Sequence, residues 1–262
     1  MTADGKKTGE LLLAAKKAMA EEAACVRLST GFEQKLELGR RVTEPPAWAK
    51  ERADIAARLQ SRPGRLRLAL TGGIASGKTA VAGMLEKRGA AHIDFDVLAR
   101  RAVEPGSPGA AQAADLFGAD FINEDGSLKR REVSRLIFSD PEKKAALENI
   151  IHPLTWELMA GELIRLAEAP QVVISVPLLF EAGLETFFSP IVMVFAAPAV
   201  QMARLTARNP ELDESQAMAM IETQWPAPPK VTGSNYIINN NGSLEDTARQ
   251  VEALWRELGA ID

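Results

Sequence analysis

Gly72-Gly73-Ile74-Ala75-Ser76-Gly77-Lys78-Thr79 is the stretch of this sequence that decides the fold. This glycine loop matches G-x-x-x-x-G-K-[ST], a pattern whose backbone N–H groups cradle nucleotide phosphates. Lys78 brings a positive charge to the β- and γ-phosphates, and the Thr79 hydroxyl is suited to bind Mg²⁺. The helix that follows directs the positive end of its dipole at the same phosphates. We therefore predict a nucleotide-phosphate site with these contact residues: Gly73, Ile74, Ala75, Ser76, Gly77, Lys78, Thr79 and Ala80.

The flanking residues supply the strand and the helix that this loop requires. Leu66-Arg67-Leu68-Ala69-Leu70 reads as a short strand that follows the turn-forming Pro63-Gly64. After the loop, apolar residues recur at helical spacing over 81–88, and Gly89 marks a stop. Strand, loop and helix in this order favour a phosphate site over a chance match. A decayed loop in a protein without catalytic activity is the alternative.

Composition limits the class of protein. With 262 residues, 46% of them hydrophobic, the chain is long enough for one α/β domain and an appendage. The net charge of −4 and the lack of an arginine-rich tract argue against nucleic-acid binding. Cys25 is the single cysteine, so no disulfide can form within the chain, as is typical of a reducing compartment. There is no signal-peptide pattern and no bilayer-spanning apolar run, so we expect a cytoplasmic protein without membrane contacts.

Residues 1–62 differ from the rest of the chain. Glu10 to Ala24 is rich in Ala, Lys, Glu and Leu, and further helices are expected over 32–41 and 47–59. The linker Ser61-Arg62-Pro63-Gly64 follows. We find no chemical constellation in this N-terminal helical extension and interpret it as a cap or a disordered leader. A partner-binding module is the alternative.

From residue 63 to residue 262, strands and helices alternate. This alternation predicts an α/β domain with a parallel sheet covered by helices on both faces, a three-layer α/β/α fold. The expected strands are 66–70, 91–94, 171–176, 191–195 and 235–238. The expected helices after the loop helix are 97–103, 109–117, 131–138, 142–168, 199–208, 214–223 and 244–258. Ser243, with Asp246 three residues later, forms a capping-box pattern at the start of the last helix.

The second strand ends in Asp94-Phe95-Asp96. In parallel sheets, ligands bind beyond the carboxyl ends of the strands, where the glycine loop also lies. Asp94 and Asp96 are therefore expected near the γ-phosphate, and they point the same way if the strand continues. A carboxylate there can take the proton of an acceptor hydroxyl or help to hold Mg²⁺ through water. The alternative for Asp96 is a structural N-cap of the helix that starts at Val97, a role compatible with catalysis.

His152 and the pair Arg204 and Arg208 each have a functional and a structural interpretation. His152 precedes Pro153 in a long helical stretch, and a lone histidine is more often structural than ligand-binding. Arg204 and Arg208 lie four residues apart on one helix face, where they can stabilise the charge of a transferring phosphoryl group when a lid closes. Their alternative is a solvated helix face. Ser175, at the end of the third strand, stands where such nucleotide enzymes often carry a metal-binding aspartate, which is missing here.

Taken together, residues 66–258 resemble the dephospho-CoA kinase family, which catalyses the last step of coenzyme A biosynthesis. The glycine loop alone is generic. The Asp pair, His-Pro-Leu and Pro-Leu-Leu-Phe-Glu in this order are much more specific. The matching segments are Leu70–Thr79, Ile93–Arg100, Val103–Gly106, Asp125–Leu128, Ile137–Pro141, Ile151–Leu154, Val176–Glu181, Arg204, Arg208, Gln224 and Asn240–Glu245.

The resemblance implies a P-loop kinase fold with a helical substrate-binding region and a mobile lid over about residues 208–232. It implies ATP and Mg²⁺ on the donor side and the ribose 3′-hydroxyl of dephospho-CoA as the acceptor. The implied roles are Asp96 as general base; Lys78 and Arg204 as further catalytic residues; Arg208 as a nucleotide contact; Thr79 as the Mg²⁺ ligand; and Asp94, Arg100 and His152 as acceptor-binding residues.

The predicted lid departs from the family pattern. Within Gln224–Lys230 the lysine is kept, but Ala227 stands in place of the usual arginine. A P-loop kinase acting on another small hydroxyl acceptor is therefore an alternative. A weakly catalytic nucleotide- or CoA-binding protein with a partner-binding N-terminal extension is a third reading. We expect a small-molecule substrate and a monomer or small homo-oligomer.

Overall fold

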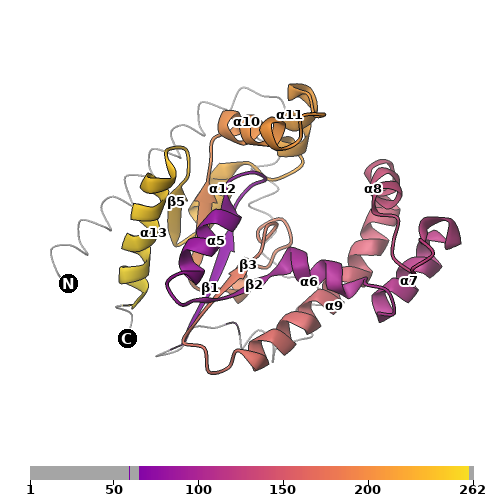
Figure 1. The fold of residues 1–262 in the computed structure, drawn as a ribbon, viewed down its shortest axis with the longest axis horizontal. Helices are drawn as coiled ribbons and strands as arrows, with labels where there is room; N and C mark the ends of the chain where they lie inside the picture. Colours follow the sequence, from indigo (N-terminus) through magenta and orange to yellow (C-terminus); the bar gives the residue numbers. More distant parts are fainter. Residues whose placement is uncertain (1–58, 60–64, 260–262) are drawn as a thin grey trace. The chain divides into compact units, whose positions relative to one another are not determined.

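The computed structural model describes Leu59 and residues 65–259, and the rest of the predicted N-terminal extension lies outside the described residues. The strands in Figure 1 are β1 (Leu66–Thr71), β2 (Ala91–Asp94), β3 (Gln171–Ser175), β4 (Ile191–Phe195) and β5 (Tyr236–Asn239). The helices are α5 (Lys78–Glu86), α6 (Phe95–Ala102), α7 (Pro108–Phe117), α8 (Arg130–Ser139), α9 (Pro141–Arg165), α10 (Pro198–Arg208), α11 (Glu214–Glu222), α12 (Ala227–Gly233) and α13 (Leu244–Gly259).

The strands form one sheet in the order β2-β3-β1-β4-β5. β1 pairs in parallel with both β3 and β4, and β4 pairs in parallel with β5. Leu70 of β1 lies opposite Ser175 on one side and Val192 on the other. Residues 67–71 of β1 are buried. The strand that leads into the glycine loop is therefore a central strand, and the predicted parallel sheet is confirmed.

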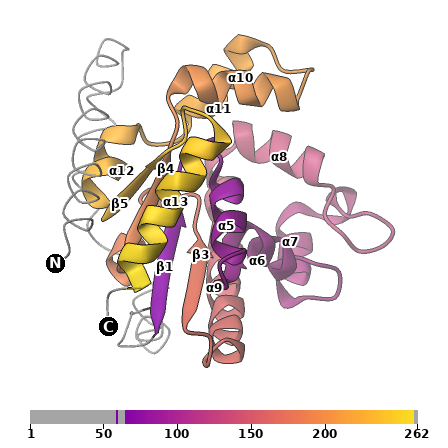
Figure 2. The ribbon, with the colours of Figure 1, turned by 60° about the vertical axis from the view of Figure 1, so that its left-hand side comes forward.

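Helices cover both faces of this sheet. Val192 and Val194 of β4 share a core cluster with residues of α5 and α13, whereas Met193 and Phe195 pack with Val231 of α12. Successive residues of a strand point to opposite faces. α5 and α13 therefore lie on one face and α12 on the other, and Figure 2 shows α5 and α13 side by side along the sheet. The predicted three-layer arrangement is confirmed.

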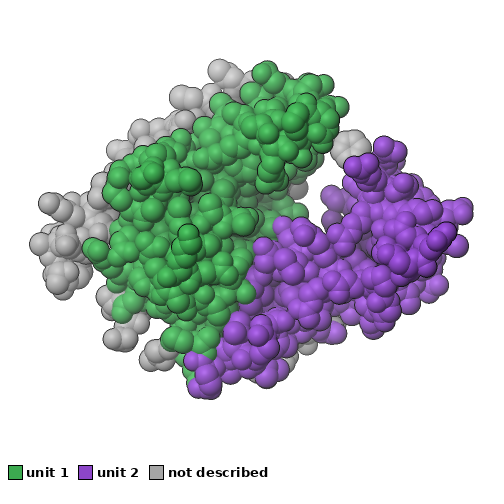
Figure 3. Space-filling model, in the orientation of Figure 1, with its two compact units in different colours: residues 1–50, 59–92, 169–262 green, residues 51–58, 93–168 purple. Residues whose placement is uncertain are grey.

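The described chain divides into two compact units, which are coloured separately in Figure 3. The sheet unit comprises Leu59 and residues 65–92 and 169–259, and the helical unit comprises residues 93–168. The boundary between the units falls within β2, so the strand that carries Asp94 connects them.

The helical unit has an apolar core of its own. Phe117 of α7, Leu128 and Val133 at the start of α8, and Leu147 of α9 form one buried cluster. α6 also packs on α9, where the rings of Phe95 and Trp156 meet edge to face with centroids 6.1 Å apart. Among the helices of the described ranges, none combines the length and the apolar character needed to span a membrane.

Within residues 65–259, the predicted element boundaries agree with the structure to within three residues, and the helices predicted over 10–24, 32–41 and 47–59 lie outside the described residues apart from Leu59. Ser243 and Asp246 form the predicted capping box, with Asp246 N donating to Ser243 Oγ at 3.1 Å and Ser243 N donating to Asp246 Oδ2 at 3.2 Å. The one α-helix in the described ranges that the sequence did not predict is α12, which carries Pro228 and Pro229 near its start. Both prolines fall in the first turn, where N–H groups have no partner within the helix, so proline is tolerated there.

Candidate active site

The glycine loop runs from β1 into α5, as predicted. Ala75 has φ of 54° and Gly77 has φ of 93°, so both adopt left-handed conformations. Left-handed residues that alternate with right-handed ones turn neighbouring N–H groups toward one point, which makes a concave anion site. Gly77 is also the N-cap of α5, and no side chain caps that helix, so its partial positive charge is directed at the same place.

Backbone donors of the loop are available for a ligand. Ser76 N is used within the loop, where it donates to Gly73 O at 3.1 Å. Within the described ranges, the N–H groups of Ala75 and Gly77 donate to no acceptor. Backbone donors in partly buried positions are rarely left unpaired, and phosphate oxygens are suitable acceptors for them. The loop therefore fits the nucleotide phosphates that the sequence predicted.

Three amide side chains hold the loop from outside. Ile74 N donates to Oε1 of Gln224 at 2.7 Å, and Ile74 O accepts from Nε2 of Gln201 at 2.6 Å. Ser76 O accepts from Nδ2 of Asn240 at 2.7 Å. Gln201 and Asn240 are 7% and 3% exposed, respectively, so these are buried polar contacts with specific partners. They fix the direction of the peptide groups that form the anion site.

The two predicted arginines of α10 differ in their surroundings. Arg204 is half-buried, with Nη1 at 3.4 Å from Ala75 O and 3.3 Å from Ser76 O, and Nη2 at 2.8 Å from Asn240 O. Its positive charge thus lies directly against the glycine loop. Arg208, one turn later, is exposed, and its side chain makes no hydrogen bond or ion pair with the part of the chain that the structure describes.

The start of α6 differs from the sequence-based expectation. Asp94, not Asp96, is the N-cap, and its Oδ1 accepts from Asp96 N at 2.8 Å and from Val97 N at 3.3 Å. The helix begins at Phe95, so the strand ends before the two aspartates can alternate along it. Asp96 is exposed in the first turn, and the exposed Arg100 follows four residues later on the same helix face.

His152 lies on α9, which continues through Pro153 without interruption from Pro141 to Arg165. Burial lowers the pKa of His152, and the nearby Glu148 carboxylate opposes this shift. The imidazole is therefore biased toward its neutral form. α9 packs against α6, the helix of Asp96 and Arg100.

The predicted residues thus fall into two groups, one in each unit. The sheet unit carries the phosphate-contact residues 73–80, Arg204 and Arg208, and the helical unit carries Asp94, Asp96, Arg100 and His152.

Ser175 has a structural partner. It is 2% exposed, and its Oγ lies 2.8 Å from Nε2 of His92 on β2. In the described ranges, no three His, Cys, Asp or Glu side chains form a group that could hold a metal ion. Mg²⁺ in phosphate sites commonly takes one or two protein oxygens and completes its shell with phosphates and water. The exposed Thr79 at the start of α5 fits that pattern.

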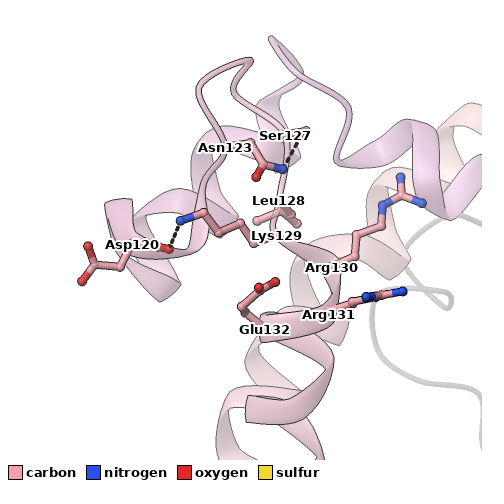
Figure 4. Close-up of a pocket in the computed structure, with 8 residues that line it drawn as sticks. All are labelled: Asp120, Asn123, Ser127, Leu128, Lys129, Arg130, Arg131 and Glu132. Carbon is pink, nitrogen blue, oxygen red and sulfur yellow. Dashed lines mark hydrogen bonds between the residues drawn. The ribbon is translucent and has the colours of Figure 1, made fainter.

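A separate hollow of about 690 Å³ lies on the helical unit at the start of α8 (Figure 4). There Lys129 Nζ donates to the Asp120 carbonyl at 2.8 Å, while Arg130 and Arg131 extend away from Asp120. None of the predicted acceptor-binding residues lines it. The lining residues are Asp120, Asn123, Ser127, Leu128, Lys129, Arg130, Arg131 and Glu132.

Sequence reasoning missed Gln201 and assigned no role to Asn240. Gln201 lies three residues before Arg204 and seven before Arg208, and this spacing places it on their helix face. That shared face was the available signal. The orientation of the Asn240 side chain is fixed by Thr247, whose Oγ1 donates to Asn240 Oδ1 at 2.7 Å. This contact has no local sequence signature.

A parallel sheet whose central strand leads into a phosphate loop, with a helical unit inserted after β2, defines a P-loop kinase. The family model described as dephospho-CoA kinase matches residues 66–246. The chain belongs to the dephospho-CoA kinase family.

Individual relatives agree with this assignment. The dephospho-CoA kinase of Syntrophotalea carbinolica is 44% identical over 195 residues, which cover 74% of this chain and 92% of that protein. The one from Listeria innocua is 37% identical and covers 70% of this chain and 92% of its own. The crystal structure of TT1252 from Thermus thermophilus superposes with a TM-score of 0.66 at 36% identity, covering 74% of this chain and 98% of that one. A dephospho-CoA kinase structure from Campylobacter jejuni (TM-score 0.56, 19% identity, covering 73% and 96% of the two chains) shares the fold.

We predict that Gly77→Ala severely weakens ATP binding. A Cβ at this position would lie 2.0 Å from Asn240 Nδ2, and φ of 93° is unfavourable for alanine by about 1–2 kcal/mol. The loop must therefore distort, and we expect the dissociation constant for ATP, measured by calorimetry, to rise at least about tenfold.

Gly83→Ala is the matched control. Gly83 lies inside α5, and a Cβ there meets nothing within 4 Å. The change should stabilise the helix by up to about 1 kcal/mol and leave ATP affinity unchanged. Equal ATP affinity in the two variants would contradict the explanation for Gly77.

We also predict a pH-dependent stability contribution from His152. Its pKa in the folded protein is below the usual 6.5, so below pH 6.5 the unfolded chain binds more protons than the folded one. The free energy of unfolding should fall as pH drops through 6.5 toward the lowered pKa. Urea unfolding of the native protein and of His152→Asn between about pH 7 and pH 5 measures this, and a parallel pH dependence in both would refute it.

Proposed function

We propose that this protein transfers the γ-phosphoryl group of ATP to the ribose 3′-hydroxyl of dephospho-CoA, producing coenzyme A and ADP. The observation that carries the proposal is family membership over residues 66–246, because the name of that family states the acceptor. The anion-binding conformation of the glycine loop supports a phosphoryl donor.

On the donor side, the loop N–H groups and the N-terminus of α5 hold the phosphates of ATP. Lys78 places its ammonium group at the β- and γ-phosphates, and Thr79 is the protein ligand of Mg²⁺. Mg²⁺, when bound, neutralises charge on the phosphate oxygens. Arg204 adds a positive charge against the loop carbonyls, which favours the charge-rich transition state. Arg208 is assigned to the nucleotide when the lid over about residues 208–232 closes.

On the acceptor side, we assign Asp96 as the general base. Its carboxylate accepts the proton of the 3′-hydroxyl while that oxygen bonds to the γ-phosphorus, and the β,γ-bridging P–O bond breaks with its electrons leaving on ADP. The carboxylate of Asp94 caps α6 and so orients the turn that carries Asp96. Arg100 and His152 are assigned to acceptor binding. A neutral imidazole at position 152 can donate or accept a hydrogen bond without repelling Arg100.

The setting we propose is cytoplasmic. The protein would act there as a monomer or a small homo-oligomer on a small-molecule substrate, without nucleic acid or a membrane. The net charge of −4 supports the exclusion of nucleic acid as a partner, because nucleic-acid binding relies on positive charge.

The decisive experiment measures ADP release with Mg²⁺-ATP and a panel of acceptors: dephospho-CoA, nucleoside monophosphates and sugars. We expect dephospho-CoA to accelerate ADP release well above all other acceptors. Activity on another member of the panel would favour a P-loop kinase for a different hydroxyl acceptor. We consider this alternative because Ala227 stands in the lid where the family usually has an arginine. Tight ATP binding without turnover on any acceptor would favour a weakly catalytic binding protein.

We predict that Lys78→Ala and Asp96→Asn separate donor binding from chemistry. Lys78→Ala removes the phosphate charge and should abolish turnover together with most ATP affinity. Asp96→Asn keeps the side-chain shape but cannot accept the proton, so ATP should bind normally while kcat falls by about 10²-fold or more. Calorimetry with ATP and steady-state rates check this. Parallel losses of ATP binding and rate in Asp96→Asn would assign Asp96 a structural role instead.

A further inference from the structure

Two glutamine side chains hydrogen-bond to the backbone N–H and carbonyl of one residue in the glycine loop. The Ile74 N–H donates to Gln224 at 2.7 Å, and the Ile74 carbonyl accepts from Gln201 at 2.6 Å. Gly73 lies beside both amides. An ideal Cβ on Gly73 would be 2.6 Å from Gln201 Nε2 and 3.4 Å from Gln224 Oε1. The glutamines reach the loop this closely because residue 73 has no side chain.

The residue after Ile74 is held in a conformation that it would otherwise leave. Ala75 has φ of 54°, a left-handed conformation that residues with a Cβ seldom adopt. Such strain persists only where the surroundings fix it, and it clusters at functional sites. Here the peptide groups on both sides of Ile74 are fixed by Gln224 and Gln201. These two hydrogen bonds oppose a change of Ala75 to a right-handed or extended conformation. Such a change would turn the loop N–H groups away from a phosphate.

Gln224 is itself anchored by its neighbours. Trp225 N donates to Glu181 Oε1 at 2.9 Å, and the same oxygen lies 2.6 Å from Lys230 Nζ. Lys230 is 1% exposed, and this carboxylate is its ion-pair partner in the interior. The ion pair therefore holds residue 225 in place, and with it the adjacent Gln224.

We propose that Gln201 and Gln224 are positioning residues for nucleotide binding, which hold Ile74, and through it Ala75, so that the loop N–H groups face a phosphate before ATP arrives. Glu181 and Lys230 anchor Gln224 in this role. The inference rests on the proposed function only in taking ATP as the ligand of the loop. Because Gln224 lies in the predicted lid, ATP binding and the position of that segment influence each other reciprocally.

The first test removes the amides without removing volume. Gln201→Met and Gln224→Met should each weaken ATP binding about tenfold in calorimetry without acceptor, equivalent to about 1.4 kcal/mol. KM for ATP should rise by a similar factor, and KM for dephospho-CoA should change less than about twofold. Asn235→Leu is the matched control, because Asn235 Oδ1 also accepts a backbone N–H, from Ile191 at 2.8 Å, and lies outside both the loop and the predicted lid. Its ATP affinity should equal that of the native protein.

A second measurement reads the loop directly in the ligand-free protein. Amide hydrogen exchange at Ile74 should accelerate in Gln224→Met, which removes the acceptor of that N–H, and should change less in Gln201→Met. Adding Ala75→Gly should reduce the effect of Gln224→Met on ATP affinity to less than about threefold, since glycine adopts the left-handed conformation without strain.

Two results would overturn the inference. One is ATP affinity within about twofold of the native protein in both methionine variants. The other is unchanged exchange at Ile74 in Gln224→Met. Both measurements omit the acceptor, so they test this inference independently of the proposed function. An enzyme that binds ATP but does not phosphorylate dephospho-CoA would overturn the proposed function and leave this inference standing.

Discussion

An anion site made from backbone N–H groups exists only while the chain holds an unusual shape, and here that shape depends on Ala75 and Gly77. Both residues are left-handed, at φ of 54° and 93°. Glycine adopts such a conformation readily and alanine does not, so the loop needs external support at Ala75. Hydrogen bonds from α10, from the segment after α11 and from the end of β5 provide it. The binding competence of the loop is therefore a property of the whole sheet unit.

The strand order explains how these supports reach the loop. β1 lies between β3 and β4, and β5 follows β4, so the carboxyl ends of these parallel strands meet at one edge of the sheet. α10 begins just after β4, Asn240 just after β5, and Glu181 follows β3. Gln201 and Asn240, which follow β4 and β5, therefore contact the loop at the end of β1, while Glu181, which follows β3, binds Trp225 beside Gln224. A ligand site at this edge follows from the topology.

The sequence predicted what local chemistry encodes and missed what the tertiary fold decides. The glycine loop and the sheet were predictable, because turn glycines and buried strands act over a few residues. Gln201 and Gln224 were not assigned to the loop, because their partner Ile74 lies 127 and 150 residues away. The cap of α6 was misassigned to Asp96 because either aspartate satisfies the capping preference, and only the observed end of β2 selects Asp94. α12 was missed because proline argues against a helix except in its first turn.

The chemical nature of the supports matters as much as their position. The loop must receive a polyanion, so a carboxylate in contact with it would repel the ligand at short range. Among the described residues, the side chains that hydrogen-bond to Ile74 and Ser76 are neutral amides and one guanidinium. The nearby carboxylate of Glu181 is paired with the buried Lys230 and accepts the Trp225 N–H, so its charge is compensated within the anchor. Neutral hydrogen bonds can thus shape the loop while its own N–H groups, Lys78 and the N-terminus of α5 keep the positive potential for the phosphates.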